Sequence, residues 1–294
     1  MSVGQITSRK DTHTIGGAPA RMRTKDRARW ITWFCFGWFG LVVLAGLFGP
    51  LIWQVSPNAL DLLNLYSGFS LEHPMGTDDT GRDILARVLA GIPSTLMGPV
   101  LVVIFSGAIG ALFGLIAGWF GGFVDTLISR VFDILFSFPG LIVAILASAL
   151  FGAGFWAPVV ALSIGYIPIL GRIVRIETRR ERNLPYIAAL EVQGQSRLVI
   201  WLKHILPNLV PIFVVQTAIG FSYAMLDLAA ISYLGLGPQP PATDWGLLVS
   251  TGQNGILAGH PGQSVIASLL VATTVVSANL LSDRLAEKFE IGER

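Results

Sequence analysis

Long stretches without a single charged residue constrain this chain more than any other feature. Residues 31–58, 88–124 and 134–171 contain no Lys, Arg, Asp or Glu, and residues 205–282 contain only Asp227 and Asp244. A helix needs about 20 apolar residues to cross the hydrocarbon core of a bilayer. We therefore predict membrane spans at about 31–53, 96–120, 124–151, 155–174, 205–226 and 264–281, with Pro139 bending the third span.

These six spans predict an all-α membrane protein embedded in a lipid bilayer. The chain is 53% hydrophobic and 13% charged, whereas a soluble domain is about 25% charged. This composition argues against a soluble enzyme and against intrinsic disorder. The second span is rich in glycine and alanine, which predicts close helix packing inside the bundle. One cysteine and four scattered histidines give no disulfide and no metal-ligand spacing.

The few basic residues predict how the chain is oriented. All but two of the 20 lysines and arginines fall before the first span, near the ends of the second and fourth spans, or after the sixth. Short cytoplasmic segments of membrane proteins carry this excess. We expect both termini in the cytoplasm, with residues 1–29 as a polar tail and residues 30–294 as the transmembrane domain. The first apolar segment is too long for a cleaved signal.

The loop between the fourth and fifth spans predicts a helix, a tight turn and a second helix. Pro185 suits a first helical turn, Gly194 suits a helix C-terminus, and Ser196 can cap the next helix. Apolar residues then recur at helical spacing up to Ile205, and Pro207 falls near the start of the fifth span. Such a compact unit between arginines is suited to docking another protein.

Two segments on the predicted outer side carry strong local signals. In the first, residues 73–83, Thr80 and Asp83 predict a capping box, followed by a helix lying in the interface or on the bundle. In the second, residues 234–246, the density of glycine and proline predicts a rigid irregular turn, with Trp245 as an interfacial anchor. On the inner side, Arg130 and Asp133 have the i, i+3 spacing of an ion pair.

The loop between the fourth and fifth spans resembles the EAA motif of ABC-importer permeases, which docks in a cleft of a cytoplasmic ATPase. The motif's glutamate position is occupied by Ala188, and its second alanine by Leu190, while Glu191 stands nearby. The residues that this resemblance assigns to the ATPase-coupling loop are Tyr186, Ala188, Ala189, Glu191, Gly194, Ser196, His204, Pro207 and Asn208.

Three further segments resemble the dipeptide, oligopeptide and nickel branch of that family, specifically its C-type subunit. Residues 234–246 are similar to LGLGxQPPxPxWG, and residues 279–285 to NLLGDxL, with Ser282 in place of glycine. Residues 73–83 carry every position of HPxGTDxxGRD. That external signature comprises His73, Pro74, Gly76, Thr77, Asp78, Gly81, Arg82 and Asp83.

The resemblance implies a type I ABC importer permease in the cytoplasmic membrane, moving di- or oligopeptides by alternating access. Its implied partners are a second homologous permease, two cytoplasmic ATPase subunits and an external substrate-binding protein. ATP and magnesium would bind the ATPases, and no cofactor is expected on this chain. Nickel or another small solute remains an alternative cargo. The pathway-lining candidates are Gln216, Thr217, Ser222 and Asp227.

Other classes of function have weaker support. No P-loop sequence occurs, and we expect neither catalytic activity nor nucleic-acid binding. A stand-alone secondary transporter or channel stays open, although no chain of charged residues runs through the spans. A membrane-embedded hydrolase would need Ser70 or Ser222 as a nucleophile, and neither Gly-Phe-Ser sequence continues to the second glycine of a nucleophile elbow.

Overall fold

A computed structural model describes residues 20–292, with side-chain environments for residue 30 and residues 32–287. The helices are α1 Ala20–Ile52, α2 Ile84–Phe120, α3 Gly122–Phe136, α4 Gly140–Phe151, α5 Trp156–Arg182, α6 Pro185–Val192, α7 Arg197–Ile200, α8 Leu206–Tyr233, α9 Trp245–Thr251, α10 Gln253–Leu257 and α11 Gly262–Gly292. A π-helical turn, Trp201–Ile205, joins α7 to α8. No β-strand occurs between residues 20 and 292.

The predicted all-α membrane fold is confirmed. Five helices are long and apolar enough to cross a membrane, and α3 with α4 makes a sixth crossing if the pair is counted as one bent span. The bend between α3 and α4 is 71°. It falls where the sequence predicts it, because Pro139 is the residue that caps the N-terminus of α4.

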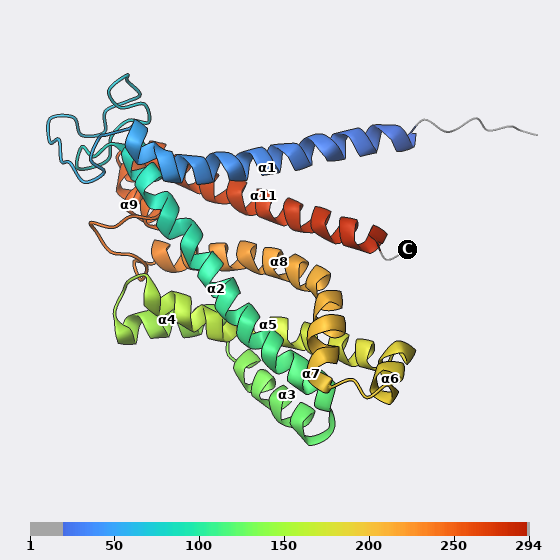
Figure 1. The fold of residues 1–294 in the computed structure, drawn as a ribbon. Coiled ribbons are helices and arrows are strands. Elements are labelled where there is room, and N and C mark those ends of the chain that lie inside the picture. The colour runs from blue at the N-terminus through green and yellow to red at the C-terminus, as the bar shows by residue number, and fades with distance from the viewer. Residues whose placement is uncertain (1–19, 293–294) are drawn as a thin grey trace, which may run out of the picture.

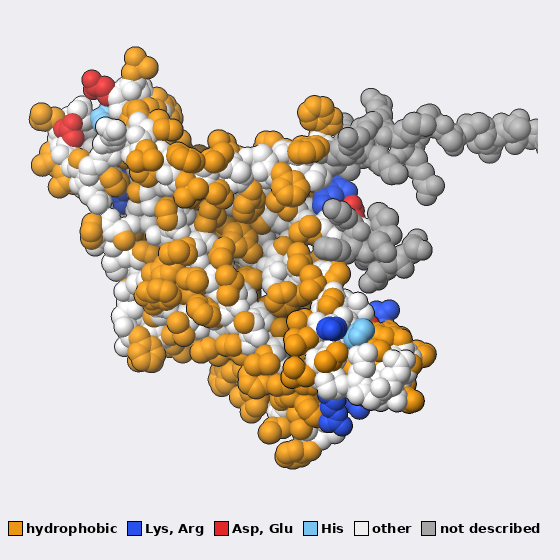
Figure 2. Space-filling model, viewed as in Figure 1, with side chains coloured by type: hydrophobic (Ala, Val, Ile, Leu, Met, Phe, Trp, Pro, Cys, Tyr) orange, Lys and Arg blue, Asp and Glu red, His pale blue; other side chains and the backbone are white. Residues whose placement is uncertain are grey.

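The long helices run between two ends of the molecule (Figure 1). The 53–83 loop, the 234–244 segment and α9 lie at one end. The start of α1, the end of α11 and the α6–α7 segment lie at the other. The helix α1 begins at Ala20, so part of the expected tail is helical, and residues 1–19 lie outside the described part. In Figure 2 an apolar surface covers the middle, and most visible Lys and Arg side chains gather at the α6 end.

Glycine residues let α2 and α5 pack backbone to backbone. A Cβ added to Gly110 would lie 2.8 Å from the Ile167 carbonyl oxygen, and one on Gly114 would lie 2.4 Å from that of Gly171. Such contacts exclude any side chain at these positions. The prediction that the second span is internal is therefore supported. In lipid the hydrophobic effect does not drive helices together, and small residues instead allow the close packing that holds them.

The helix α2 is longer than predicted. The expected interfacial helix after Asp83 and the expected span at 96–120 form one continuous helix of 37 residues. Pro93 and Pro99 lie inside it without ending it. Asp83 alone caps its start by accepting a hydrogen bond from the Ala86 amide, at 2.6 Å. Thr80 instead donates to Asp78, so the expected capping box is wrong.

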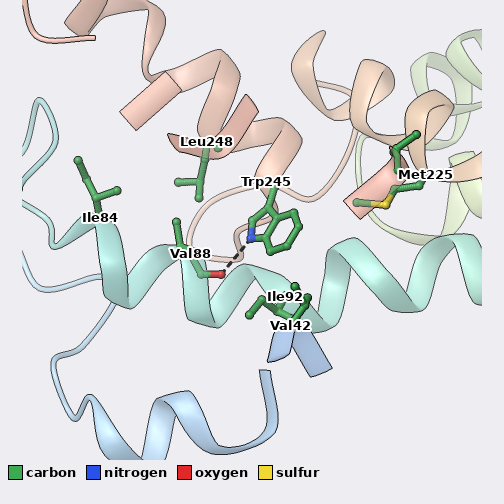
Figure 3. Packing of buried hydrophobic residues seen from close by; sticks show 9 residues of the cluster. Val42, Ile84, Val88, Ile92, Met225, Trp245 and Leu248 are labelled. Carbon is green, nitrogen blue, oxygen red and sulfur yellow. Dashed lines mark hydrogen bonds between the residues drawn. The ribbon is translucent and has the colours of Figure 1, made fainter. Parts of the chain in front are cut away.

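Trp245 is a core residue and not the expected interfacial anchor. Its side chain is 1% exposed and packs among Val88, Ile92 and Leu248 (Figure 3). Its indole Nε1 donates to the Val88 carbonyl oxygen at 3.1 Å. The indole thus connects the start of α2 to α9, which the sequence did not reveal because the two segments are far apart in the chain.

Three ion pairs join α3 to α5, of which the contact between Asp125 and Arg179 Nη1 is the longest at 3.9 Å. Asp125 accepts hydrogen bonds from Nε and Nη2 of Arg175, the second at 2.8 Å. Asp133 accepts from Arg172 Nη2, also at 2.8 Å. The expected pair between Arg130 and Asp133 is wrong, because the partner of Asp133 comes from the neighbouring helix.

Candidate functional site

The α6–α7 segment, residues 185–205, has the predicted helix–turn–helix form. Pro185 occupies the first turn of α6. Gly194 has φ +79°, which only glycine adopts at little cost. The amides of Gly194 and Gln195 close the helix by donating to the carbonyls of Glu191 and Leu190. Ser196 then caps α7 by accepting from the Val199 amide at 3.4 Å.

A buried apolar cluster holds this segment against the bundle. Ile187 of α6, Ile200 of α7 and Ile205 of the π-helical turn are each at most 1% exposed. They pack with Trp119 near the end of α2 and with Val174 of α5. The α6–α7 segment is therefore attached to the spanning helices by packing.

A hydrogen-bonded triad joins the segment to both helices that it connects. Glu181 Oε1, at the end of α5, accepts hydrogen bonds from Tyr186 Oη and from Asn208 Nδ2, the latter at 2.6 Å. Burial, with the hydrogen bond to Glu181, raises the pKa of Tyr186 to about 12. Sequence reasoning found Tyr186 and Asn208 but missed Glu181, whose one visible signal is an acid within a run of arginines.

The exposed face of the segment carries two large apolar side chains among small and polar ones. Val192 is 89% exposed and Leu198 66%. Ala188, Ala189, Glu191, Gly194 and Ser196 are exposed as well. Within the described residues the Glu191 side chain makes no hydrogen bond or ion pair, and it is exposed next to Ala188 and Ala189. The aromatic ring of His204 lies 6.4 Å from that of Tyr186, and Pro207 lies in the first turn of α8.

The external signature forms one hydrogen-bonded unit around two aspartates. Asp78 Oδ1 accepts from the amides of Thr80 and Arg82, both at 2.9 Å, and from the Thr80 hydroxyl. Its Oδ2 accepts from Arg82 Nε at 2.7 Å and from Arg87 Nη1 at 2.6 Å. Burial alone would raise the pKa of Asp78, but these hydrogen bonds and the Arg82 charge hold that pKa below its ordinary value.

The remaining signature residues stabilise the same loop. Asp83 accepts from Trp53 Nε1 at 3.2 Å and lies 2.9 Å from His73 Nδ1. Thr77 accepts from the Ser67 amide at 2.8 Å. Gly81 has φ +75°, and a Cβ there would lie 1.8 Å from the Asp61 carbonyl oxygen. Gly76 also has positive φ, and Pro74 follows His73 in the turn. The signature therefore folds the external loop onto α2.

A cavity of about 310 Å³ opens at this external end. Residues 66–69 and 75–79 line one side of it, and residues 251–263 line the other. The rings of Tyr66 and His260 stack across it with centroids 4.9 Å apart. Nearby, Asp244 caps α9, and burial raises its pKa.

The four pathway-lining candidates on α8 are not equivalent. Ser222 is 1% exposed and donates to the Ala218 carbonyl of its own helix. Thr217 likewise donates to Val214, at 2.9 Å. Gln216 is half-buried. Asp227 accepts a hydrogen bond from Tyr166 of α5 at 2.9 Å. Ser222 is thus buried with its donor used inside α8, whereas Gln216, Thr217 and Asp227 are half-buried and keep hydrogen-bonding atoms available for another molecule.

More than half of the chain matches a known family. Residues 110–291 match the family model described as the inner membrane component of binding-protein-dependent transport systems. The chain belongs to this family. The resemblance drawn from the sequence is thereby confirmed, and so is the assignment to the inner membrane. Within the described side chains no group of His, Cys, Asp or Glu could hold a metal ion.

Several relatives of this inner membrane component are similar along most of their length. A dipeptide transport system permease protein of Alkalihalophilus pseudofirmus is 34% identical, over 84% of this chain and 81% of that protein. A glutathione transport system permease protein of Pectobacterium atrosepticum is 35% identical, over 79% and 77%. A putative peptide transport system permease protein of Brucella suis is 40% identical, over 73% and 72%.

A solved structure supports the fold of this inner membrane component. A chain of the MetNI methionine ABC transporter superposes with a TM-score of 0.53, covering 69% of this chain and 95% of the other. The sequences are 20% identical, so this likeness concerns the arrangement of helices alone.

Proposed function

We propose that this chain is a pore-forming subunit of an ATP-driven importer of di- or oligopeptides. The single observation that carries the proposal is the α6–α7 segment. It is packed against α2 and α5 and hydrogen-bonded through Glu181, and it presents an exposed apolar face with Val192 and Leu198. Such a face would otherwise remain in contact with water, and an apolar patch of this kind marks a protein interface.

Two cytoplasmic ATPases would dock on such segments, one on this chain and one on a second, homologous permease. The docking residues on this chain are Tyr186, Ala188, Ala189, Glu191, Gly194, Ser196, His204, Pro207 and Asn208. ATP and magnesium bind the ATPases in this proposal. Closure of the ATPases would move the α6–α7 segment, and its attachment to α5 and α8 would transmit that motion to the spans by alternating access.

The proposed orientation places the α6 end and both termini in the cytoplasm. The concentration of Lys and Arg at that end supports it (Figure 2). The signature loop and the 310 Å³ cavity then face outward, where an external binding protein would deliver substrate. Peptides are the proposed cargo because the dipeptide and peptide permeases named above are similar over most of their length.

Reconstituted transport tests this proposal. The chain, its partner permease, the ATPases and the binding protein are placed in proteoliposomes, and uptake of a labelled dipeptide is measured with ATP or a non-hydrolysable analogue. We expect uptake with ATP and no uptake with the non-hydrolysable analogue. Uptake that survives without hydrolysis would favour a secondary transporter, and uptake of nickel but not dipeptide would change the cargo.

A further inference from the structure

One carboxylate lies among the spanning helices without a basic partner. Asp227 of α8 is half-buried, and its Oδ2 accepts from Tyr166 Oη at 2.9 Å. Among the described side chains, no Lys, Arg or His pairs with it, and its Oδ1 accepts no hydrogen bond. The two aspartates of α3 differ, because Asp125 and Asp133 are each paired with an arginine.

Asp227 shares one face of α8 with other polar side chains. Positions 216, 220, 223 and 227 are spaced by four, three and four residues, which places them on one helix face. Gln216 is half-buried, Gly220 has no side chain, and Tyr223 is 59% exposed. The phenol of Tyr223 is therefore exposed, while Gln216 and Asp227 lie at the edge of the packed core, where Asp227 also reaches Tyr166 of α5.

Such a polar face is costly against lipid. Acids within spanning helices are rare because their transfer into hydrocarbon is unfavourable, and they almost always face the bundle interior or a water-filled cavity. The hydrogen bond from Tyr166 goes to Oδ2 and leaves Oδ1 of Asp227 without a donor among the described residues. A face of α8 with such a carboxylate is better accommodated against water or another polar group than against hydrocarbon.

We propose that Asp227 binds the primary ammonium group of the transported substrate as it passes between the two permeases. For a peptide that group is the α-ammonium at its N-terminus, so this inference rests on the proposed function. An ammonium group has three hydrogen-bond donors and no acceptor, so it matches a carboxylate oxygen that has no donor. The hydrogen bond between the two is charge-assisted. Tyr166 is a positioning residue that fixes the carboxylate, and the ring of Tyr223 offers a face for the cation.

The first test compares two dipeptides in proteoliposomes holding the complete transporter. One dipeptide has a free amino group and the other is N-acetylated, and each is supplied on saturating binding protein. We expect Asp227→Asn to lower the turnover of the free peptide at least tenfold. Asp227→Glu should retain most of the wild-type turnover, and Tyr166→Phe should have a turnover between those of the two Asp227 variants. Uptake of the acetylated peptide should not change. Asp133→Asn, which removes a carboxylate from α3, serves as the matched control.

Two results would overturn the inference: an equal loss for both peptides, or no loss for either. Both are distinguishable from failure of the proposed function, in which the wild-type transporter carries neither peptide with ATP.

The second test needs no delivered substrate. Cys35 is the only cysteine of the chain, so Asp227→Cys in a Cys35→Ser background carries one thiol. We expect a cationic, membrane-impermeant thiosulfonate to modify it at least ten times faster than a thiol at Leu269, an exposed apolar position on α11. A thiol at Leu63, which is 96% exposed in the external loop, confirms that the reagent is active. Equal, slow reaction at Asp227 and Leu269 would exclude an aqueous face.

Discussion

Arg87 Nη1 donates a hydrogen bond to Asp78 Oδ2 at 2.6 Å, and both side chains are almost fully buried where the external loop meets α2. Removing one partner of a buried ion pair typically costs about 3–5 kcal/mol, because the other charge is left without compensation. We expect Asp78→Asn to lower the free energy of unfolding by about that amount, measured by thermal unfolding in detergent. Asp79→Asn is the control, since its contact with Arg82 is longer, at 3.8 Å, and its side chain is only half-buried.

The same carboxylate gives a pH prediction. Because the pKa of Asp78 in the folded protein lies below its ordinary value of 3.8, its stabilisation is present above 3.8 and is lost as the pH falls through the lower folded value. The difference in melting temperature between wild type and Asp78→Asn should therefore be constant from pH 5 to pH 8. A difference that shrinks on going from pH 8 to pH 5 would contradict this account.

Gly194 offers a separate test of the α6–α7 segment. Its φ is +79° and no atom lies within 4 Å of the position of an added Cβ, so the cost of substitution is conformational and not steric. We expect Gly194→Val to destabilise the turn between α6 and α7 by about 1–2 kcal/mol. ATP-dependent uptake should fall severalfold, while the amount of protein inserted in the membrane should not change. Gly194→Asn should retain more uptake, because asparagine tolerates this conformation. Equal uptake by the two variants would contradict a conformational role.

We expect Glu181 to contribute more to transport than to stability. Replacing Glu181 with alanine removes the acceptor shared by Tyr186 and Asn208. Because both partners are exposed and can bond to water, we expect less than about 1 kcal/mol of destabilisation but a severalfold loss of uptake per ATP hydrolysed. Glu177→Ala, which removes an exposed contact with Arg180, is the matched control. An equal effect of the two variants would exclude the proposed role of Glu181.

Packing of α2 against α5 can be tested at Gly114. A Cβ there would lie 2.4 Å from the Gly171 carbonyl oxygen, so the two helices would have to separate. We expect Gly114→Ala to cost about 1–3 kcal/mol, measured by thermal unfolding in detergent. Gly37→Ala in α1 meets no atom within 4 Å and should leave stability almost unchanged.

Local signals in the sequence predicted local structure well. The charge-free stretches, the bend at Pro139, the turn at Gly194 and the cap at Ser196 all depend on residues close together in the chain, and the structure has each of them. Contacts between distant segments were not predictable in this way. Trp245 was expected at an interface because tryptophan is enriched at membrane interfaces, whereas it is buried in the core and its partner Val88 lies in α2.

The same distinction holds for the candidate site. The signature residues were found as a motif, but only the folded loop shows that Asp78 and Asp83 organise it. Glu181 was missed because its partners lie 5 and 27 residues away. Asp227 was found from its isolation among apolar residues, while its partner Tyr166 on α5 required the structure.

The uninterrupted length of α2 has a mechanical consequence. Its 37 residues extend about 55 Å, well beyond a hydrocarbon core of about 30 Å. Trp245 holds one end through the Val88 carbonyl, and Arg182 holds the other through the carbonyl of Trp119. A rod fixed at both ends cannot change its tilt at one membrane surface alone. One continuous helix therefore connects the packing around Trp245 at one end of the molecule with the packing around Trp119 at the other, and any change in the tilt of α2 would be felt at both ends.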